Sequence, residues 1–147
     1  MSYRWTTRAQ YGIKALLELS LHGHQQPLSV KTIADRQGLP APFLEKVLGA
    51  LRQAGIVRSV RGVQGGYQLA QPLTAISLAT ILTALGEEIR MAGSDTQDSI
   101  SDQVIQTLSD RLSQRFAGVL AEISLEDLYF DARSCEAAQS EVPEFMV

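Results

Sequence analysis

Cysteine is almost absent from this chain of 147 residues, which contains only Cys135. One thiol cannot form an intramolecular disulfide, so a fold stapled by disulfides is excluded and a cytoplasmic location is expected. The sequence also lacks the run of roughly eighteen apolar residues that a membrane-spanning helix requires. Its first residues, MSYRWTTRAQYG, contain no apolar stretch of the kind found in secretory signal peptides, so none is expected.

The residue patterns of enzymes are missing too. No nucleophile paired with a base is evident. The glycine-rich segment 62–66 joins two expected strands, whereas a phosphate-binding loop precedes a helix. His22 and His24 lie close together without a third ligand nearby in the sequence, a pattern more typical of a solvated loop than of a metal site. We therefore expect a protein that is not an enzyme and holds no metal ion at these histidines.

Acidic residues are scarce in the first part of the chain. Residues 1–86 contain nine Lys or Arg against three Asp or Glu, which gives a net charge of +6. Residues 87–147 contain four against thirteen, which gives −9. A basic module attached to an acidic one favours a polyanionic partner, because Lys and Arg contact phosphates and their field attracts DNA. The alternative is a surface charge that is unevenly distributed without consequence.

The spacing of apolar residues predicts three helices, over 8–22, 29–38 and 41–54. Each is followed or ended by a glycine, namely Gly23, Gly38 or Gly55. Between the second and third helices, Pro40 cannot continue the preceding helix, whereas Pro42 suits the first turn of the next. Two helices joined by so tight a turn are typical of a helix-turn-helix.

Two short strands are expected over 56–61 and 66–70, because a turn with three glycines joins them. A fourth helix is expected over 77–86. The hairpin would then be the wing of a winged helix-turn-helix domain at residues 1–86. The predicted fold class is mainly α with a small β-hairpin wing.

The second part of the chain has a different character. Residues 87–102 are small, polar and acidic, which indicates a linker. Residues 103–133 are expected to form a long dimerisation helix, to about 122, and a C-terminal helix capped by Ser124. Residues 134–147 are expected to be a frayed acidic tail.

The long helix has an apolar stripe with partial coiled-coil spacing, formed by Ile105, Leu108, Leu112, Phe116, Val119, Leu120 and Ile123. The winged domain is expected to close its own core, so we expect this stripe to pair with a second copy of the chain. Because Phe116, Leu120 and Ile123 widen the stripe, the helix is expected to touch a DNA-binding domain as well as the partner helix. The alternative is that it folds back onto its own domain.

Candidate DNA contacts follow from this fold, because the third helix of such a domain enters the major groove with its N-terminal residues at the base edges. Phe43 could contact a thymine methyl and Glu45 could accept from cytosine N4; the alternatives are a core Phe43 and a solvated Glu45. Lys46 and Arg52 suit phosphates. The arginines beside the hairpin turn suit the narrow minor groove, unless they are simply solvated. The expected DNA-binding set is Thr7, Arg8, Pro42, Phe43, Glu45, Lys46, Arg52, Arg58, Arg61 and Gln64.

Three segments closely resemble the IscR, NsrR and CymR family of bacterial regulators. They are FLEKVLGALRQAGIVRSVRGVQGGYQLA at 43–70, TTRAQYGIKALLELS at 6–20 and LSDRLSQRFAGVLAEISLEDL at 108–128. The resemblance covers about residues 3–130, and its most specific part is Arg-Gly-x-x-Gly-Gly-Tyr at 61–67. It implies a winged-helix domain, a long dimerisation helix and binding to a pseudo-palindromic operator as a homodimer.

The same resemblance places the family's recognition positions on Pro42, Phe43 and Glu45, and its wing arginine on Arg61. The family often has serine at the first of these positions and tyrosine at the second. Both changes remove a hydroxyl, which suggests a different operator.

Cluster-binding members of that family have three cysteines in the loop before the long helix, whereas residues 90–103 here contain none. Thiolates are the usual ligands of iron–sulfur clusters. We therefore expect a homodimeric DNA-binding repressor without the three-cysteine cluster. Two alternatives stay open: a redox-sensing regulator whose cluster has atypical ligands that include Cys135, and a winged-helix adaptor that binds proteins and no DNA.

Overall fold

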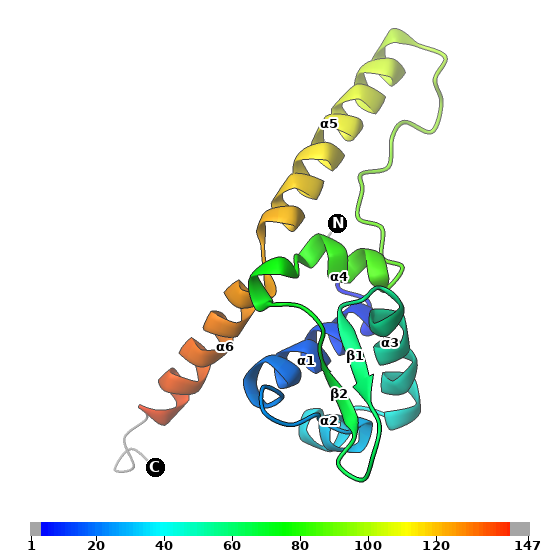
Figure 1. The fold of residues 1–147 in the computed structure, drawn as a ribbon. Coiled ribbons are helices and arrows are strands. Elements are labelled where there is room, and N and C mark those ends of the chain that lie inside the picture. The colour runs from blue at the N-terminus through cyan, green and yellow to red at the C-terminus, as the bar shows by residue number, and fades with distance from the viewer. Residues whose placement is uncertain (1–3, 142–147) are drawn as a thin grey trace.

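Helices predominate in the computed structural model, which describes residues 4–141 (Figure 1). Its elements are α1 (Thr7–His22), α2 (Val30–Gln37), α3 (Ala41–Gln53), β1 (Val57–Val60), β2 (Gly66–Leu69), the 3-10 helix η1 (Leu73–Ala75), α4 (Leu78–Ala84), α5 (Ile100–Glu122) and α6 (Leu125–Ser140). Figure 1 shows a body formed by α1 to α4 and the hairpin, with α5 projecting from it and α6 leaving it in another direction. The expected fold class, mainly α with a β-hairpin wing, is confirmed.

A tight turn connects α2 to α3, as the glycine and proline pattern predicts. Ser29 caps α2 by accepting a hydrogen bond from the Thr32 N–H at 3.0 Å. The helix ends at Gly38, which has the left-handed conformation with φ 65° and ψ 39°. Leu39 in the turn is buried, and Pro40 precedes the first residue of α3. The two helices therefore form the expected helix-turn-helix.

The core of the body is built around one face of α3. Four α3 side chains are fully buried: Leu44, Val47, Leu48 and Leu51. They pack in one cluster with Leu16 of α1, Ile33 of α2 and Ile56, which precedes β1. Spacings of three and four residues put these α3 positions on a single face, so the remaining positions of the helix are directed outward.

Glu18 of α1 is a carboxylate within this core and joins α1 to α2. Its Oε1 accepts a hydrogen bond of 2.6 Å from Gln37 Nε2, and its Oε2 lies 3.5 Å from Arg36 Nη1. A buried carboxylate needs such partners, because desolvation penalises an unpaired charge. Since both partners belong to α2, this contact helps to fix the position of α2 against α1.

The hairpin is anchored to the body through a short bridge. β1 and β2 pair antiparallel, with Val60 opposite Gly66 and Val57 opposite Leu69. Leu28, just before α2, exchanges two backbone hydrogen bonds with Tyr67, of 3.0 and 2.8 Å. A Cβ on Gly66 would lie 2.3 Å from the Leu28 carbonyl oxygen, so only glycine permits this close approach.

α5 and the loop before it (residues 86–99), together called the arm, project away from the body (Figure 1). The body end of α5 is held by backbone hydrogen bonds of 2.7 Å from Leu78 N–H to Ile123 O and 2.8 Å from Leu125 N–H to Ile76 O. A small apolar cluster lies beside this attachment and contains Ala9, Ile13, Leu78, Leu82, Ile89, Leu120 and Ile123. No helix within residues 4–141 is both long and apolar enough to cross a bilayer.

Two boundaries in the second part of the chain differ from the sequence-based expectation. α5 begins at Ile100, before the expected residue 103, because Ser99 and Asp102 form a capping box at its start. α6 continues to Ser140, so the tail expected from 134 is helical over its first half. A second capping box, of Ser124 and Asp127, starts α6, and the strong helix formers Ala137 and Ala138 extend it.

The core is not closed by residues 1–86 alone, contrary to the expectation. Leu125 of α6 is fully buried within the main cluster, and Leu128 packs against it. A sequence pattern identifies which face of a helix is apolar, but not which distant element will cover it. The start of α6 is therefore part of the body.

Replacing Leu125 with alanine should destabilise the protein by about 2–5 kcal/mol, because a fully buried leucine is lost and a cavity is left. Urea unfolding at one fixed protein concentration measures this change. Val63→Ala is the control, since Val63 is fully exposed at the hairpin turn. An unfolding midpoint equal to that of the parent would show that α6 is not part of the core.

Candidate nucleic-acid interface

The outward face of α3 carries the side chains expected to meet DNA. Pro42, Phe43, Glu45, Lys46 and Arg52 are all exposed, and they alternate with the buried positions of the same helix. Pro40 makes no side-chain capping bond, so the first turn of α3 keeps free backbone N–H groups. The end of α3 that would meet DNA therefore carries partial positive charge.

Phe43 is neither a core residue nor a free one. It is 37% exposed, and its ring packs edge-to-face against Tyr11 of α1 with ring centroids 5.1 Å apart. Such a contact holds the ring in one place and leaves part of it open to a partner. The sequence pattern did not predict the role of Tyr11, because periodicity does not show which side chain of another helix a ring will meet.

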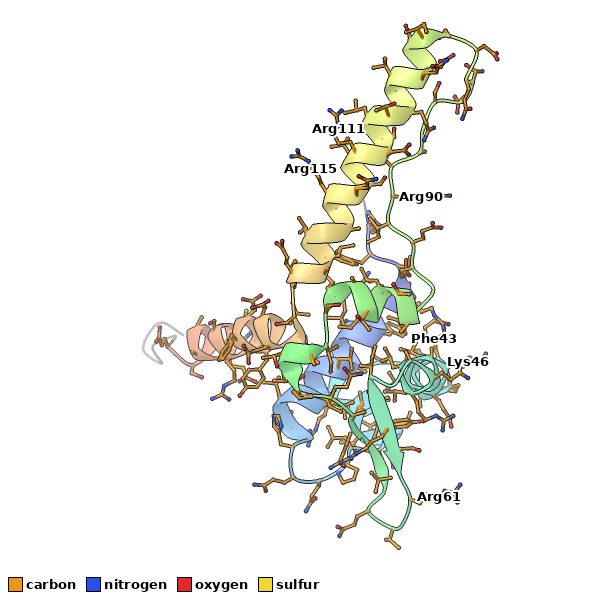
Figure 2. All side chains as sticks on the ribbon, turned by 45° about the horizontal axis from the view of Figure 1, so that its top comes forward. Phe43, Lys46, Arg61, Arg90, Arg111 and Arg115 are labelled. Carbon is orange, nitrogen blue, oxygen red and sulfur yellow. The ribbon has the colours of Figure 1, made fainter. Side chains whose placement is uncertain are left out.

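Several charged side chains on this side of the body have no protein partner. Within residues 4–141, no side-chain hydrogen bond or ion pair engages Glu45, Lys46, Arg52 or Arg61. Figure 2 shows that Phe43, Lys46 and Arg61 project from the same side of the body. An unpaired cation at a surface remains available for phosphate, so this side has the features of a nucleic-acid interface.

The two arginines of the wing lie in different surroundings. Arg58 Nη2 donates a hydrogen bond of 3.2 Å to Gln68 Oε1, the residue opposite it on β2. Arg61 stands at the turn itself, where Gly65 N–H donates to the Gly62 carbonyl at 3.0 Å. Gln64 is exposed beside it. Arg61 is thus the more available of the two.

The two expected contacts in α1 lie in different surroundings. Thr7 is exposed at the first residue of the helix. Arg8 is only half exposed, and its Nε donates a hydrogen bond of 2.9 Å to the Leu85 carbonyl oxygen at the end of α4. The structure therefore directs part of Arg8 toward the body.

The apolar stripe of α5 is divided into two parts. Ile105, Leu108, Leu112, Phe116 and Val119 are between 43% and 51% exposed. Leu120 and Ile123 pack instead against Ala9, Leu78 and Leu82 of the body. The first group therefore forms the exposed part of the stripe.

The loop before α5 is held by hydroxyl groups around one carboxylate. Asp102 accepts hydrogen bonds of 2.8 Å from Ser94 Oγ and from Thr96 Oγ1, and one of 3.2 Å from Ser99 N–H. These bonds, that of Ser94 foremost, lower the pKa of Asp102 to about 2, so the carboxylate is charged at neutral pH. Further along, Ser113 Oγ accepts from Met91 N–H, and Ser109 Oγ donates to the Ala92 carbonyl.

These residues do not fit a three-cysteine cluster. The loop offers hydroxyl and carboxylate oxygens where thiolates would be needed, and the oxygens are engaged with one another. No group of three or more His, Cys, Asp or Glu within the described chain could hold a metal ion, and that includes His22 and His24. Cys135 is exposed on α6, a helix that leaves the body in a different direction from the loop (Figure 1).

The geometry defines the class of protein: a winged helix-turn-helix with an unpaired basic side and a projecting arm. The chain belongs to the Rrf2 family, described as iron-dependent transcriptional regulators, which matches residues 5–131. It is accordingly a transcriptional regulator of the DNA-binding kind and not an enzyme, and the resemblance to IscR and CymR is confirmed.

Individual relatives agree with this assignment. A Synechocystis sp. protein named as an HTH-type transcriptional regulator is 49% identical over 97% of this chain and 98% of its own. The structure of T. potens IscR matches with a TM-score of 0.75 and 33% identity, over 99% of this chain and 97% of its own. That of CymR, described as the global cysteine regulator of B. subtilis, matches with a TM-score of 0.74 and 30% identity, over 87% and 97%.

Proposed function

We propose that the protein binds a pseudo-palindromic operator as a homodimer, with α3 in the major groove and the wing in the adjacent minor groove. The observation that carries this proposal is the set of unpaired side chains on one side of the body, above all Lys46 and Arg61 (Figure 2). The net charge of +6 over residues 1–86 supports it, because this charge draws the basic module to DNA.

Base recognition falls to the first turns of α3. The exposed part of the Phe43 ring suits a thymine methyl, and the unpaired Glu45 carboxylate suits the amino group of cytosine. Pro42 has no side-chain donor, so it contributes shape and no hydrogen bond. The operator should therefore differ from those of relatives that have serine and tyrosine at positions 42 and 43.

Dimerisation falls to the exposed part of the α5 stripe. A projecting helix of 23 residues is about 35 Å long, and such an apolar face on a monomer would favour aggregation. A second copy presents the same face, so a two-fold axis across α5 buries both. Such a dimer presents two copies of α3 to the two half-sites of a palindrome.

The regulator acts as a repressor in this proposal, and it responds to its signal without the three-cysteine cluster. The hydroxyl and carboxylate contacts around Asp102 support the absence of the cluster, because they order the loop by protein contacts alone. The two rivals predict different behaviour. A cluster with atypical ligands requires iron and Cys135, and a protein-binding adaptor would show no salt-dependent affinity for duplex DNA.

Arg61→Ala should weaken operator binding and reduce the slope of log affinity against log salt concentration by about 0.9, because one phosphate-equivalent contact is lost. Arg133→Ala is the matched control, since it removes the same charge from α6, far along the chain from the wing. Fluorescence anisotropy across a salt series measures both. Equal affinity of parent and Arg61→Ala at every salt concentration would rule out this role of the wing.

Leu112→Glu should produce a folded monomer or an unfolded chain, because the dimer interface at the exposed part of the α5 stripe would have to bury a charge. Operator affinity should fall with it. Gln114→Glu introduces the same charge on the opposite, polar face of α5 and should remain dimeric. Sedimentation velocity distinguishes the species. A Leu112→Glu protein that stays dimeric and binds DNA normally would place the interface elsewhere.

Protein purified without oxygen should contain neither stoichiometric iron nor sulfide, because the loop before α5 offers no thiolate. Iron and sulfide assays together with the visible absorption spectrum measure this. If the parent contains both and Cys135→Ser contains neither, the atypical cluster with that thiol as a ligand is correct and the present proposal is wrong.

A further inference from the structure

Besides the small apolar cluster around Leu78 and Leu82, hydrogen bonds attach the arm to the body at two places. One is the backbone bridge between Ser77 and Ser124 at the body end of α5. The other lies where the loop leaves α4, at Leu85 just before the loop and at Glu87 within it, and consists of side chains at the start of α1. Arg8 Nε donates to the Leu85 carbonyl at 2.9 Å, and Thr6 Oγ1 donates to Glu87 Oε1. These two hydrogen bonds are here called the latch.

The latch is packed as well as hydrogen-bonded. Leu85 is buried against α1, and a Cβ added to Gly12 would lie 2.5 Å from Leu85 Cδ1. Thr6 also caps α1 by accepting from the Ala9 N–H at 3.1 Å. The first turns of α1 therefore hold the point at which the loop of the arm leaves the body.

The same turns of α1 also hold the recognition helix. Tyr11, one turn after Arg8, makes the edge-to-face contact with Phe43 at the start of α3. The start of α1 with its cap thus holds residues 85 and 87, where the arm leaves the body, and it also contacts α3. Any tilt of the arm relative to α1 changes the direction in which α3 is presented.

We propose that Arg8 is a positioning residue, which fixes the angle between arm and body and thereby sets the spacing of the two recognition helices in the dimer. This inference rests on the proposed homodimer. A dimer binds two half-sites only when its recognition helices have the matching separation, so a loose arm weakens binding to the full operator alone. The Arg8 Nε–H is engaged with the Leu85 carbonyl, which holds the guanidinium at the end of α4.

The test starts from an operator that the parent protein selects from a random library. Binding is then compared on three duplexes: this full operator, one of its half-sites alone, and the operator with one base pair inserted between the half-sites. Arg8→Met keeps the aliphatic stem and removes the donors. We expect it to lower full-operator affinity by about tenfold, through the lost avidity. Half-site affinity and the salt slope should be those of the parent, and the inserted base pair should cost the variant less than the parent.

Two further variants separate positioning from charge. Arg52→Met removes an exposed α3 cation and should weaken half-site and full-operator binding alike, with a reduced salt slope. Glu87→Ala removes an acidic residue, which by charge alone would strengthen DNA binding. The latch predicts the opposite, weaker binding to the full operator, and this measurement decides the matter if Arg8→Met does not fold.

Each result has a definite meaning. A reduced half-site affinity and salt slope for Arg8→Met would make Arg8 a phosphate contact and overturn the proposal. So would unchanged full-operator binding, or tighter binding by Glu87→Ala. Failure of the parent to select or bind any duplex would instead contradict the proposed function, and so the two failures are distinguishable.

Discussion

The burial of one face of α3 is the constraint on which the rest of the structure depends. Leu44, Val47, Leu48 and Leu51 have almost no exposed surface, and together they fix both the depth and the rotation of the helix. Because half of its circumference is committed to the core, the other half must lie at the surface with its side chains in a fixed direction. α1 contributes to this arrangement in two ways: Leu16 packs in the same core cluster, and the Tyr11 ring contacts Phe43.

The distribution of charge also separates the body from the arm and α6. The body presents unpaired cations beside the outward face of α3, whereas the arm and α6 contain the acidic excess. The charge of Asp102 is stabilised within the loop, because hydrogen bonds from three loop residues lower the pKa of this carboxyl to about 2. Acidic residues at a distance from the recognition helix do not compete with phosphate for its cations, because salt screens such charges over about 8 Å. The basic side can therefore act alone in a chain whose net charge is −3.

Local patterns in the sequence predicted most of the body. Apolar spacing, cap residues and the glycines at 38 and 62–66 gave the helix-turn-helix and the hairpin nearly to the residue. Contacts between distant segments could not be predicted in this way. Leu125 packs in a core whose other buried residues run from Ala15 to Leu85 in the sequence. Arg8 forms a hydrogen bond with Leu85 at a separation of 77 residues. Periodicity shows that a helix has an apolar or basic face, but the fold alone decides what meets that face. The pattern therefore predicts that Arg8 is basic and that Leu120 and Ile123 belong to an apolar stripe, but it does not show that Arg8 meets Leu85 or that Leu120 and Ile123 meet Leu78.

The most direct test of the account is hydroxyl-radical footprinting of the protein on a duplex that it selects from a random library. A two-fold dimer with α3 and the wing on DNA predicts two protected patches related by symmetry. They should lie on one face of the duplex, with centres about 10 base pairs apart or a whole multiple of that distance. A single asymmetric patch would contradict the dimer. An absence of protection at any protein concentration in low salt would contradict DNA binding through this surface.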